Sequence, residues 1–545
     1  MLDNQTKEQI ANALWLEKFD ESKIDNNLLK IINSDKNSNI AMGERMSKYL
    51  DWLIKRPQSH NPSYKKRYKM LKKYCKNLSP HQAYIYISKF IGLDATLGYE
   101  GMKKDEKLEF IRDHEVKPEV QVGWHFIVGS AWGENGKEYG IECMFFMYSM
   151  FPPEFAKEIG LSKRENQFIE LQLGVSEAGK KHWQADPVII AGTTGLIDWD
   201  VDPFSYTFGK NKISSSSNKS LFPLKVKAMG IDKNTDDSNR IEIDLTFSSG
   251  KTILLQGDEG ITPYVDGWGT LYYSIPNLVL KKGSTLKLGD ETVKLEKGTF
   301  WLDHQWGFLT GNAKSEIIRA SANTAKPGPA GWDWYMAQFD GDRQITMFAP
   351  HSKEFKDFYF NEGSKPPKLM EIGVVGKYMD EKKKLNKLTG LLRVTEWVKA
   401  ERTPNPKIYP ATNTWFPNKW EFEFKDVLPE ELRKFTMTSI VDGGQTNFFA
   451  NTSQYNEGAV IVKNSKGEEI GRGFAEAVQY ANTVPNSYRI TGITPEDSKL
   501  LENKGDNILG RLSSLAYVMT HKKALKRVMN DARGLEYFAT PKPKK

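Results

Sequence analysis

The sequence predicts a mainly β protein with two antiparallel β domains, an added N-terminal α-helical segment and a C-terminal helix. Short alternating segments, separated by turns of Gly, Asn and Asp, recur from about residue 120 to residue 478. Aromatic residues make up 12% of the chain and include 14 Trp, which favours β-rich domains over a helical bundle. The 545 residues are too many for one hydrophobic core. We predict a helical segment over residues 1–117, β domains over 118–325 and 326–494, and a basic helical tail over 495–545.

The N-terminal segment has few Gly and no alternating strands. Ser79 before Pro80 is typical of an N-cap followed by the first residue of a helix, which we expect to run to about Ile91. The segment could cover the β part, bind a partner or serve in dimerisation, and a plain accessory helical domain is the default. We expect limited proteolysis to separate it near Lys117.

A hairpin opens the first β domain. Residues 122–132 and 139–148 alternate on either side of a Gly/Asn turn at 133–136. Further strands are predicted at 168–175, 182–185, 196–201, 222–228, 240–246, 252–256, 271–275, 285–288, 292–295 and 299–302.

The second β domain begins with residues 334–339, which pair with 344–349 across the turn at 340–342. Further strands are predicted at 370–377, 390–396, 419–424, 434–440, 459–463 and 471–478. After residue 495 the pattern is helical, and residues 508–538 are amphipathic and basic. Such a helix could lie on an anionic membrane surface or pack on the second β domain with its charges in water.

Bulk properties restrict the partners. The formal charge of +8, from 77 basic and 69 acidic residues, is mild for this length, so we expect no nucleic-acid partner. Cys75 and Cys143 are interpreted as reduced, buried thiols. The polar N-terminus predicts no signal peptide, and no apolar run is long enough to span a membrane. We expect a cytoplasmic protein, with peripheral contact to a membrane through the basic tail as the alternative, and the sequence leaves the oligomeric state open.

Residues 298–307 hold the main candidate for chemistry. Alternation places Trp301, Asp303 and Gln305 on one face of the strand, and Phe300, Leu302, His304 and Trp306 on the other. A carboxylate among large aromatics loses hydration, so its pKa rises and it can serve as a general acid.

Residues 331–338 repeat the Trp/Asp pattern with Trp332, Asp333 and Trp334. We interpret the two stretches as neighbouring strands that face one apolar cavity. The alternative is that the Trp residues are ordinary core and the Asp residues are hydrogen-bonded strand ends.

Several blocks resemble the AttH/CrtC-like family of lipocalin-type hydratases and cyclases, which includes carotenoid 1,2-hydratase, kievitone hydratase and lipocalin-like Diels–Alderases. The resemblance covers about residues 120–480. The blocks that carry it are residues 256–260, 269–274, 298–307, 331–338, 455–460 and 471–480.

The resemblance implies two lipocalin/calycin-like β-barrels with an apolar pocket at or near their junction. In the hydratases an acid protonates an isolated C=C bond and water captures the carbocation. The acid of the family falls on Asp303, and His304 could orient it or hold the water. Aromatic faces stabilise a cation, and the candidates are Trp301, Trp306, Trp332, Trp334, Tyr272 and Tyr273. Asp333 is a further substrate-binding candidate, and Asp258 is either a second acid/base or a turn clamp.

The sequence has no nucleotide-binding, zinc or nucleophile-elbow motif, so we expect no cofactor and no metal. The predicted activity is that of a lyase or isomerase that protonates an apolar isoprenoid or polyene substrate, leading to hydration, dehydration or cyclisation. The alternatives are a pericyclase without proton transfer and a non-catalytic carrier of a lipid or terpenoid.

Overall fold

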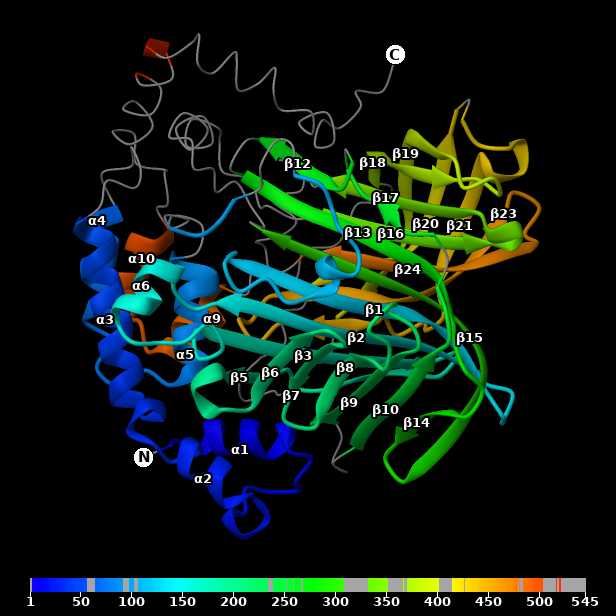
Figure 1. Ribbon diagram of the computed structural model, residues 1–545. Coiled ribbons are helices and arrows are strands. Elements are labelled where there is room, and N and C mark those ends of the chain that lie inside the picture. The colour runs from blue at the N-terminus through cyan, green and yellow to red at the C-terminus, as the bar shows by residue number, and fades with distance from the viewer. Residues whose placement is uncertain are drawn as a thin grey trace.

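Two β-sheets and a group of helices make up the described part of the protein, as the computed structural model shows (Figure 1). The structure describes residues 2–55, 64–91, 98–101, 106–233, 239–250, 252–257, 259–265, 268–307, 332–350, 366, 370–400, 414–425, 427–478, 480, 484–502, 516 and 519–520. Of residues 64, 262–265, 268, 269, 332, 350, 370 and 484 it describes the backbone alone. The predicted helix at 508–538 therefore lies almost wholly outside the described residues.

The first sheet has fifteen strands and curls into a half-barrel. Its main path runs β4-β3-β2-β1-β15-β14-β10-β9-β8-β7-β6, with β5 on β3, and with β13 on β15 followed by β11 and β12. The strands are β1 (Val122–Gly133), β2 (Glu138–Ser149), β3 (Gln167–Glu177), β4 (Lys181–Gln184), β5 (Val188–Ala191), β6 (Ile197–Val201), β7 (Phe204–Phe208), β8 (Asn211–Ser215), β9 (Leu224–Asp232), β10 (Asn239–Phe247), β11 (Leu254–Leu255), β12 (Ile261–Val265), β13 (Trp268–Val279), β14 (Ser284–Leu288) and β15 (Glu291–Gly307).

The second sheet closes into an eight-stranded barrel. Its order is β21-β20-β19-β18-β17-β16-β24-β23, and β23 pairs back onto β21, with β22 beside β21 on the same edge of β23. The strands are β16 (Trp332–Phe339), β17 (Gln344–Pro350), β18 (Met370–Met379), β19 (Leu385–Lys399), β20 (Trp415–Phe424), β21 (Lys434–Ser439), β22 (Thr446–Phe448), β23 (Gln454–Asn464) and β24 (Glu469–Val478). The predicted mainly β fold with two barrel-like sheets is confirmed.

Helices from both ends of the chain gather beside the sheets (Figure 1). Ser79 caps α5 with a reciprocal side-chain and backbone bond to Gln82, and the helix continues as a π-helical turn to Ile91, which confirms the predicted start and end. The helices are α1 (Asn4–Ala13), α2 (Asn26–Ile32), α3 (Asn39–Lys55), α4 (Tyr64–Lys72), α5 (Pro80–Ile85), α6 (Pro153–Glu158), α9 (Val484–Thr491) and α10 (Pro495–Glu502). In the described segments no helix is long and apolar enough to cross a membrane.

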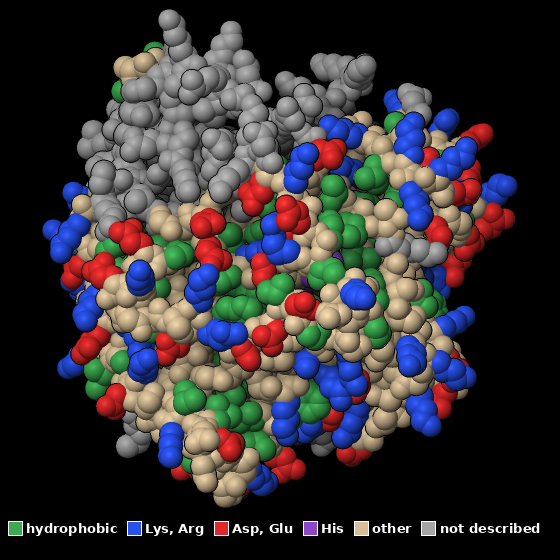
Figure 2. All heavy atoms as spheres, viewed as in Figure 1, with side chains coloured by type: hydrophobic (Ala, Val, Ile, Leu, Met, Phe, Trp, Pro, Cys, Tyr) green, Lys and Arg blue, Asp and Glu red, His purple; other side chains and the backbone are tan. Residues whose placement is uncertain are grey.

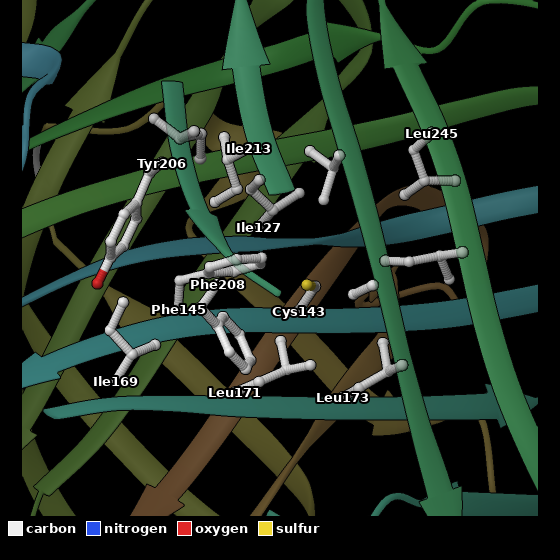
Figure 3. Packing of buried hydrophobic residues seen from close by; sticks show 14 of the residues in the cluster. Ile127, Cys143, Phe145, Ile169, Leu171, Leu173, Tyr206, Phe208, Ile213 and Leu245 are labelled. Atoms are coloured by element: carbon white, nitrogen blue, oxygen red, sulfur yellow. The ribbon is translucent and has the colours of Figure 1, made fainter. Parts of the chain in front are cut away.

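Three groups of buried apolar side chains form the interior. The first fills the curled sheet, where side chains such as Ile127, Phe145 and Leu171 lie side by side on one face of β1, β2 and β3 (Figure 3). The second lies where α3, α5, the first sheet and the second sheet meet, and it includes Trp301 and Trp334. The third fills the closed barrel. Cys75 and Cys143 are buried and free, as expected.

The described part of the outer surface mixes both signs of charge. On the face in Figure 2, Lys and Arg side chains alternate with Asp and Glu side chains without a large field of one sign. This distribution matches the mild net charge of the sequence.

Candidate active site

Strand β15 organises the first sheet and carries the candidate acid. It is 17 residues long and pairs with β14 through its first part, and with β1 and β13 through its second part. The two strands predicted at 292–295 and 299–302 are therefore one strand. Residues 296–298 between them continue the ladder with β1, because Lys297 and Gly298 pair with Trp132 and Ala131.

Asp303 sits in the middle of this sheet with Phe126 of β1 on one side and Ser274 of β13 on the other. The Tyr272 hydroxyl donates to Asp303 Oδ2 at 2.6 Å, and Trp301 Nε1 donates to Oδ1 at 2.6 Å. The Ser274 hydroxyl also donates to Oδ1. The carboxyl group is thus fixed by three donors from two neighbouring strands.

Burial decides the protonation state of this carboxyl. Asp303 is 3% exposed, and burial raises its pKa to about 7, although the bonds from Ser274, Tyr272 and Trp301 oppose that rise. A carboxyl group of this kind exchanges its proton near neutral pH, which is the property that a general acid or base needs.

Aromatic rings of both sheets surround the Asp303 side of β15. The Trp301 ring meets the Trp334 ring of the second sheet edge to face, with centroids 6.2 Å apart, and Phe126 meets Trp334 at the same separation. The predicted residues Trp301, Tyr272 and Trp334 are therefore brought together with Asp303 at the contact between the two sheets.

His304 lies on the opposite face of β15, as the alternation predicts. Its ring stacks on His125 with centroids 3.8 Å apart, and its two nitrogens lie 2.8 Å from the carbonyl oxygen of Trp124 and 3.1 Å from that of Glu115. Burial holds the pKa of His304 well below its ordinary value. His304 does not contact Asp303, so the described partners that orient the carboxyl are Tyr272, Ser274 and Trp301.

Tyr273 and Trp306, two other predicted residues, lie on the same side of the first sheet as His304. The Tyr273 hydroxyl lies 2.5 Å from His114 Nδ1, and the Lys117 ammonium lies 5.3 Å from the centre of the Trp306 ring. The Tyr273 and Trp306 side chains point into the curled sheet and away from Asp303.

The interpretation that the two Trp/Asp stretches are neighbouring strands was wrong. β16 pairs with β17 and β24, whereas β15 pairs with strands of the first sheet. Asp333 points into the closed barrel, where Tyr335 and Tyr480 each donate to its Oδ2 at 3.0 Å. Alternation along β16 then places Trp334 outside the barrel and toward Asp303. The side chain of Trp332 and all of Asp258 lie outside the described residues.

The sequence interpretation missed two residues near Asp303, Ser274 and Gln256. The side-chain amide of Gln256 donates to the Ser274 hydroxyl at 2.8 Å. Both residues fall in blocks that carried the family resemblance, which was the available signal. Within the described ranges, no group of three or more His, Cys, Asp or Glu side chains is arranged to hold a metal ion.

A curled sheet and a closed barrel, with a buried carboxyl at their contact, make this a mainly β protein. Residues 101–364 match the model of the AttH-like family, which confirms the resemblance seen in the sequence.

Solved structures give distant likenesses, and no curated protein matches. A crystal structure of an AttH-like protein from Nitrosomonas europaea has a TM-score of 0.48 and 17% identity, over 69% of this chain and 98% of that chain. Kievitone hydratase from Nectria haematococca has a TM-score of 0.42 and 12% identity, over 70% and 98%. CghA with Sch210972 has a TM-score of 0.30 and 10% identity, over 70% and 96%.

Proposed function

We propose that this protein is a cofactor-independent enzyme that uses Asp303 to protonate a C=C bond of an apolar isoprenoid or polyene substrate. The observation that carries the proposal is the Asp303 carboxyl itself. It is buried among aromatic rings, its pKa is raised to about 7, and three donors hold it. The match to the AttH-like family supports an enzyme of this general kind.

In the proposed reaction the Asp303 proton forms a bond to one alkene carbon and leaves a carbocation on the other. The Asp303 carboxylate that results accepts hydrogen bonds from Tyr272, Ser274 and Trp301, which offset the cost of a buried charge. The rings of Trp301 and Trp334 stabilise the cation through their negative faces.

Two outcomes complete the reaction. In hydration, water bonds to the cationic carbon and releases a proton, which restores protonated Asp303. In cyclisation, a second C=C bond attacks the cationic carbon and moves the positive charge to another carbon, and a carbon next to that charge then loses a proton to the Asp303 carboxylate. In isomerisation, the proton loss alone ends the reaction. Neither outcome consumes an oxidant or a reductant, which is consistent with the expectation of no redox cofactor.

The test follows a deuteron from solvent into product. The full chain is incubated in D₂O with a panel of acyclic isoprenoids and polyenes, and products are analysed by mass spectrometry and NMR. We expect deuterium on carbon with the wild type, and loss of turnover with unchanged ligand affinity for Asp303→Asn. Asp232→Asn is the matched control, because Asp232 is similarly buried but lies on β9, which does not pair with β13 or β15.

The rival functions give different results in the same experiment. A pericyclase would form a cyclic product without deuterium on carbon and would keep turnover in the Asp303→Asn variant. A carrier would bind a member of the panel and return it unchanged. Either result would overturn the proposed acid role.

A further inference from the structure

Two buried glutamates face each other across the contact between the two sheets. Glu142 belongs to β2 of the first sheet and Glu457 to β23 of the second, and the exposed fractions are 2% and 1%. Each of the two carboxyl groups shifts the pKa of the other. Glu457 falls in the block at 455–460 that carried the family resemblance, and the proposed reaction assigns it no role.

Two glycines create the room for this pair. A Cβ atom on Gly140 would lie 2.5 Å from the Cβ of Ala459, so β2 and β23 approach too closely there for any side chain. Glu142 and Glu457 stand two residues further along these strands, and on the same faces. A Cβ atom on Gly174, the partner of Glu142 across the strand pair, would lie 3.0 Å from Glu142 Oε2.

A proton between the two groups would give a hydrogen bond to buried carboxyl oxygens that otherwise lack one. The Tyr455 hydroxyl lies 2.8 Å from Glu142 Oε1 and also contacts Gln172 Oε1, and it has a single proton to donate. Glu142 Oε2 and Glu457 Oε1 are buried and have no hydrogen-bond partner. An ionised carboxylate can only accept, so two carboxyl groups bond to each other only when one of them carries a proton.

The surroundings contain no described positive charge that would let both groups ionise. The titratable groups that face the pair are Tyr455, Glu476 of β24, Asp303 of β15, Cys143 and the His182 ring of β4. Within the described part of the chain, no Lys or Arg is among the groups that shift the pKa values of either carboxyl.

We propose that Glu142 and Glu457 form a proton-binding site that latches the first sheet to the second. The ligand of this site is one proton, shared by the two carboxyl groups. While the proton is bound, a hydrogen bond joins β2 to β23. When it is lost, two like charges face each other in a buried space, and the contact between the sheets weakens.

The pH range follows from the direction of the shifts. Burial raises the pKa of Glu142 to about 8, and burial together with the neighbouring carboxyl of Glu142 raises the pKa of Glu457 well above its ordinary value. At neutral pH the unfolded chain has released both protons, while the folded protein keeps at least one. The folded protein therefore takes up a proton, and its stability falls as pH rises from the ordinary glutamate pKa toward about 8.

The test measures proton uptake on folding from the pH dependence of the unfolding free energy. At pH 7 we expect the wild type to take up about one proton more than the double variant E142Q/E457Q. E138Q is the control, because Glu138 joins the same two sheets through an ordinary ion pair with Arg472, at 2.6 and 3.0 Å. E138Q should lose stability and keep the wild-type proton uptake. Equal uptake in the wild type and the double variant would overturn the proposal.

If the double variant E142Q/E457Q does not fold, a second measurement tests the proposal. Infrared spectra of protein labelled with ¹³C-glutamate separate the carboxyl groups of Glu from those of Asp303. We expect a protonated glutamate band at pH 7 that weakens in the single variant E457Q and persists in Asp303→Asn. A wild-type spectrum without that band at pH 7 contradicts a shared proton. Persistence of the full band in E457Q assigns it to another glutamate and also overturns the proposal.

Discussion

Trp301 and Trp334 touch edge to face although they belong to different sheets, with ring centroids 6.2 Å apart and planes at 70°. Trp301 also donates its indole N–H to Asp303 at 2.6 Å. The same residue therefore joins the two sheets and holds the candidate acid. Any change in how the sheets pack will reach Asp303 through this side chain.

The buried Asp303 carboxyl makes stability depend on pH. Its pKa rises from 3.8 to about 7 on folding, so its destabilising effect is absent at acid pH and grows as pH rises through this range. Relative to Asp303→Asn, we expect the wild type to lose up to about 4 kcal/mol of unfolding free energy between about pH 4 and pH 7. Denaturant titrations of both proteins at a series of pH values measure this difference. Parallel pH curves would contradict the raised pKa.

Tyr272→Phe should raise the pKa of Asp303 further. The substitution removes the hydroxyl that donates to Oδ2 at 2.6 Å and so destabilises the carboxylate relative to the acid. A hydrogen bond to a charged group contributes about 1.5–3 kcal/mol, so a rise of about one to two pKa units is expected. NMR titration of ¹³C-labelled Asp carboxyls measures it. Tyr273→Phe is the matched control, since Tyr273 bonds to His114 on the other face, and an equal effect of both variants would refute the assignment.

Removal of residues 1–117 should destabilise the rest of the protein. Tyr49 and Tyr84 are fully buried and pack on Phe151 and Phe168, at 5.0 and 5.7 Å between ring centroids. The Tyr84 hydroxyl also donates to the buried Glu170 carboxyl at 2.5 Å. These contacts argue against the separable segment that the sequence suggested.

A chain that begins at Pro118 should therefore melt at a lower temperature than the full chain and bind an apolar dye. Differential scanning calorimetry and dye fluorescence measure both effects. A truncated chain with the melting temperature of the full protein would restore the sequence-based view of an independent segment.

The basic tail should bind anionic vesicles. From residue 510 to residue 545 there are nine Lys or Arg and two acidic residues, a net charge of +7 (9 − 2). Each basic residue near an anionic surface contributes about 1 kcal/mol, and salt screens the attraction. At low salt the full chain should sediment with the vesicles, whereas a version that ends at Asn507 should stay in the supernatant. Equal behaviour of the two chains would rule the tail out as an anchor.

Alternation along a strand was enough to predict which side chains share a face. It placed Trp301 and Asp303 together and His304 with Trp306 on the other side, and β15 has this arrangement. The aromatic setting of Asp303 likewise led to the expectation of a raised pKa.

Alternation does not identify the partner of a strand. β15 and β16 carry the same Trp/Asp pattern, yet they lie in different sheets, so Asp333 points into the barrel while Trp334 faces Asp303. The Glu142–Glu457 contact joins residues far apart in the chain. Its geometry depends on the missing side chain of Gly140, which a single sequence does not reveal.

In each sheet, the first strand in the chain pairs with the last one. β1 pairs with β15, so Val122 meets Gly307, and β16 pairs with β24, so Asp333 meets Ala477. During synthesis on the ribosome, β1 cannot pair with β15 until most of the first sheet has been synthesised. Pairings over such sequence separations close slowly and leave strand edges exposed in the meantime. We therefore expect nascent chains that stop short of β15 to depend on chaperones and to aggregate when released early.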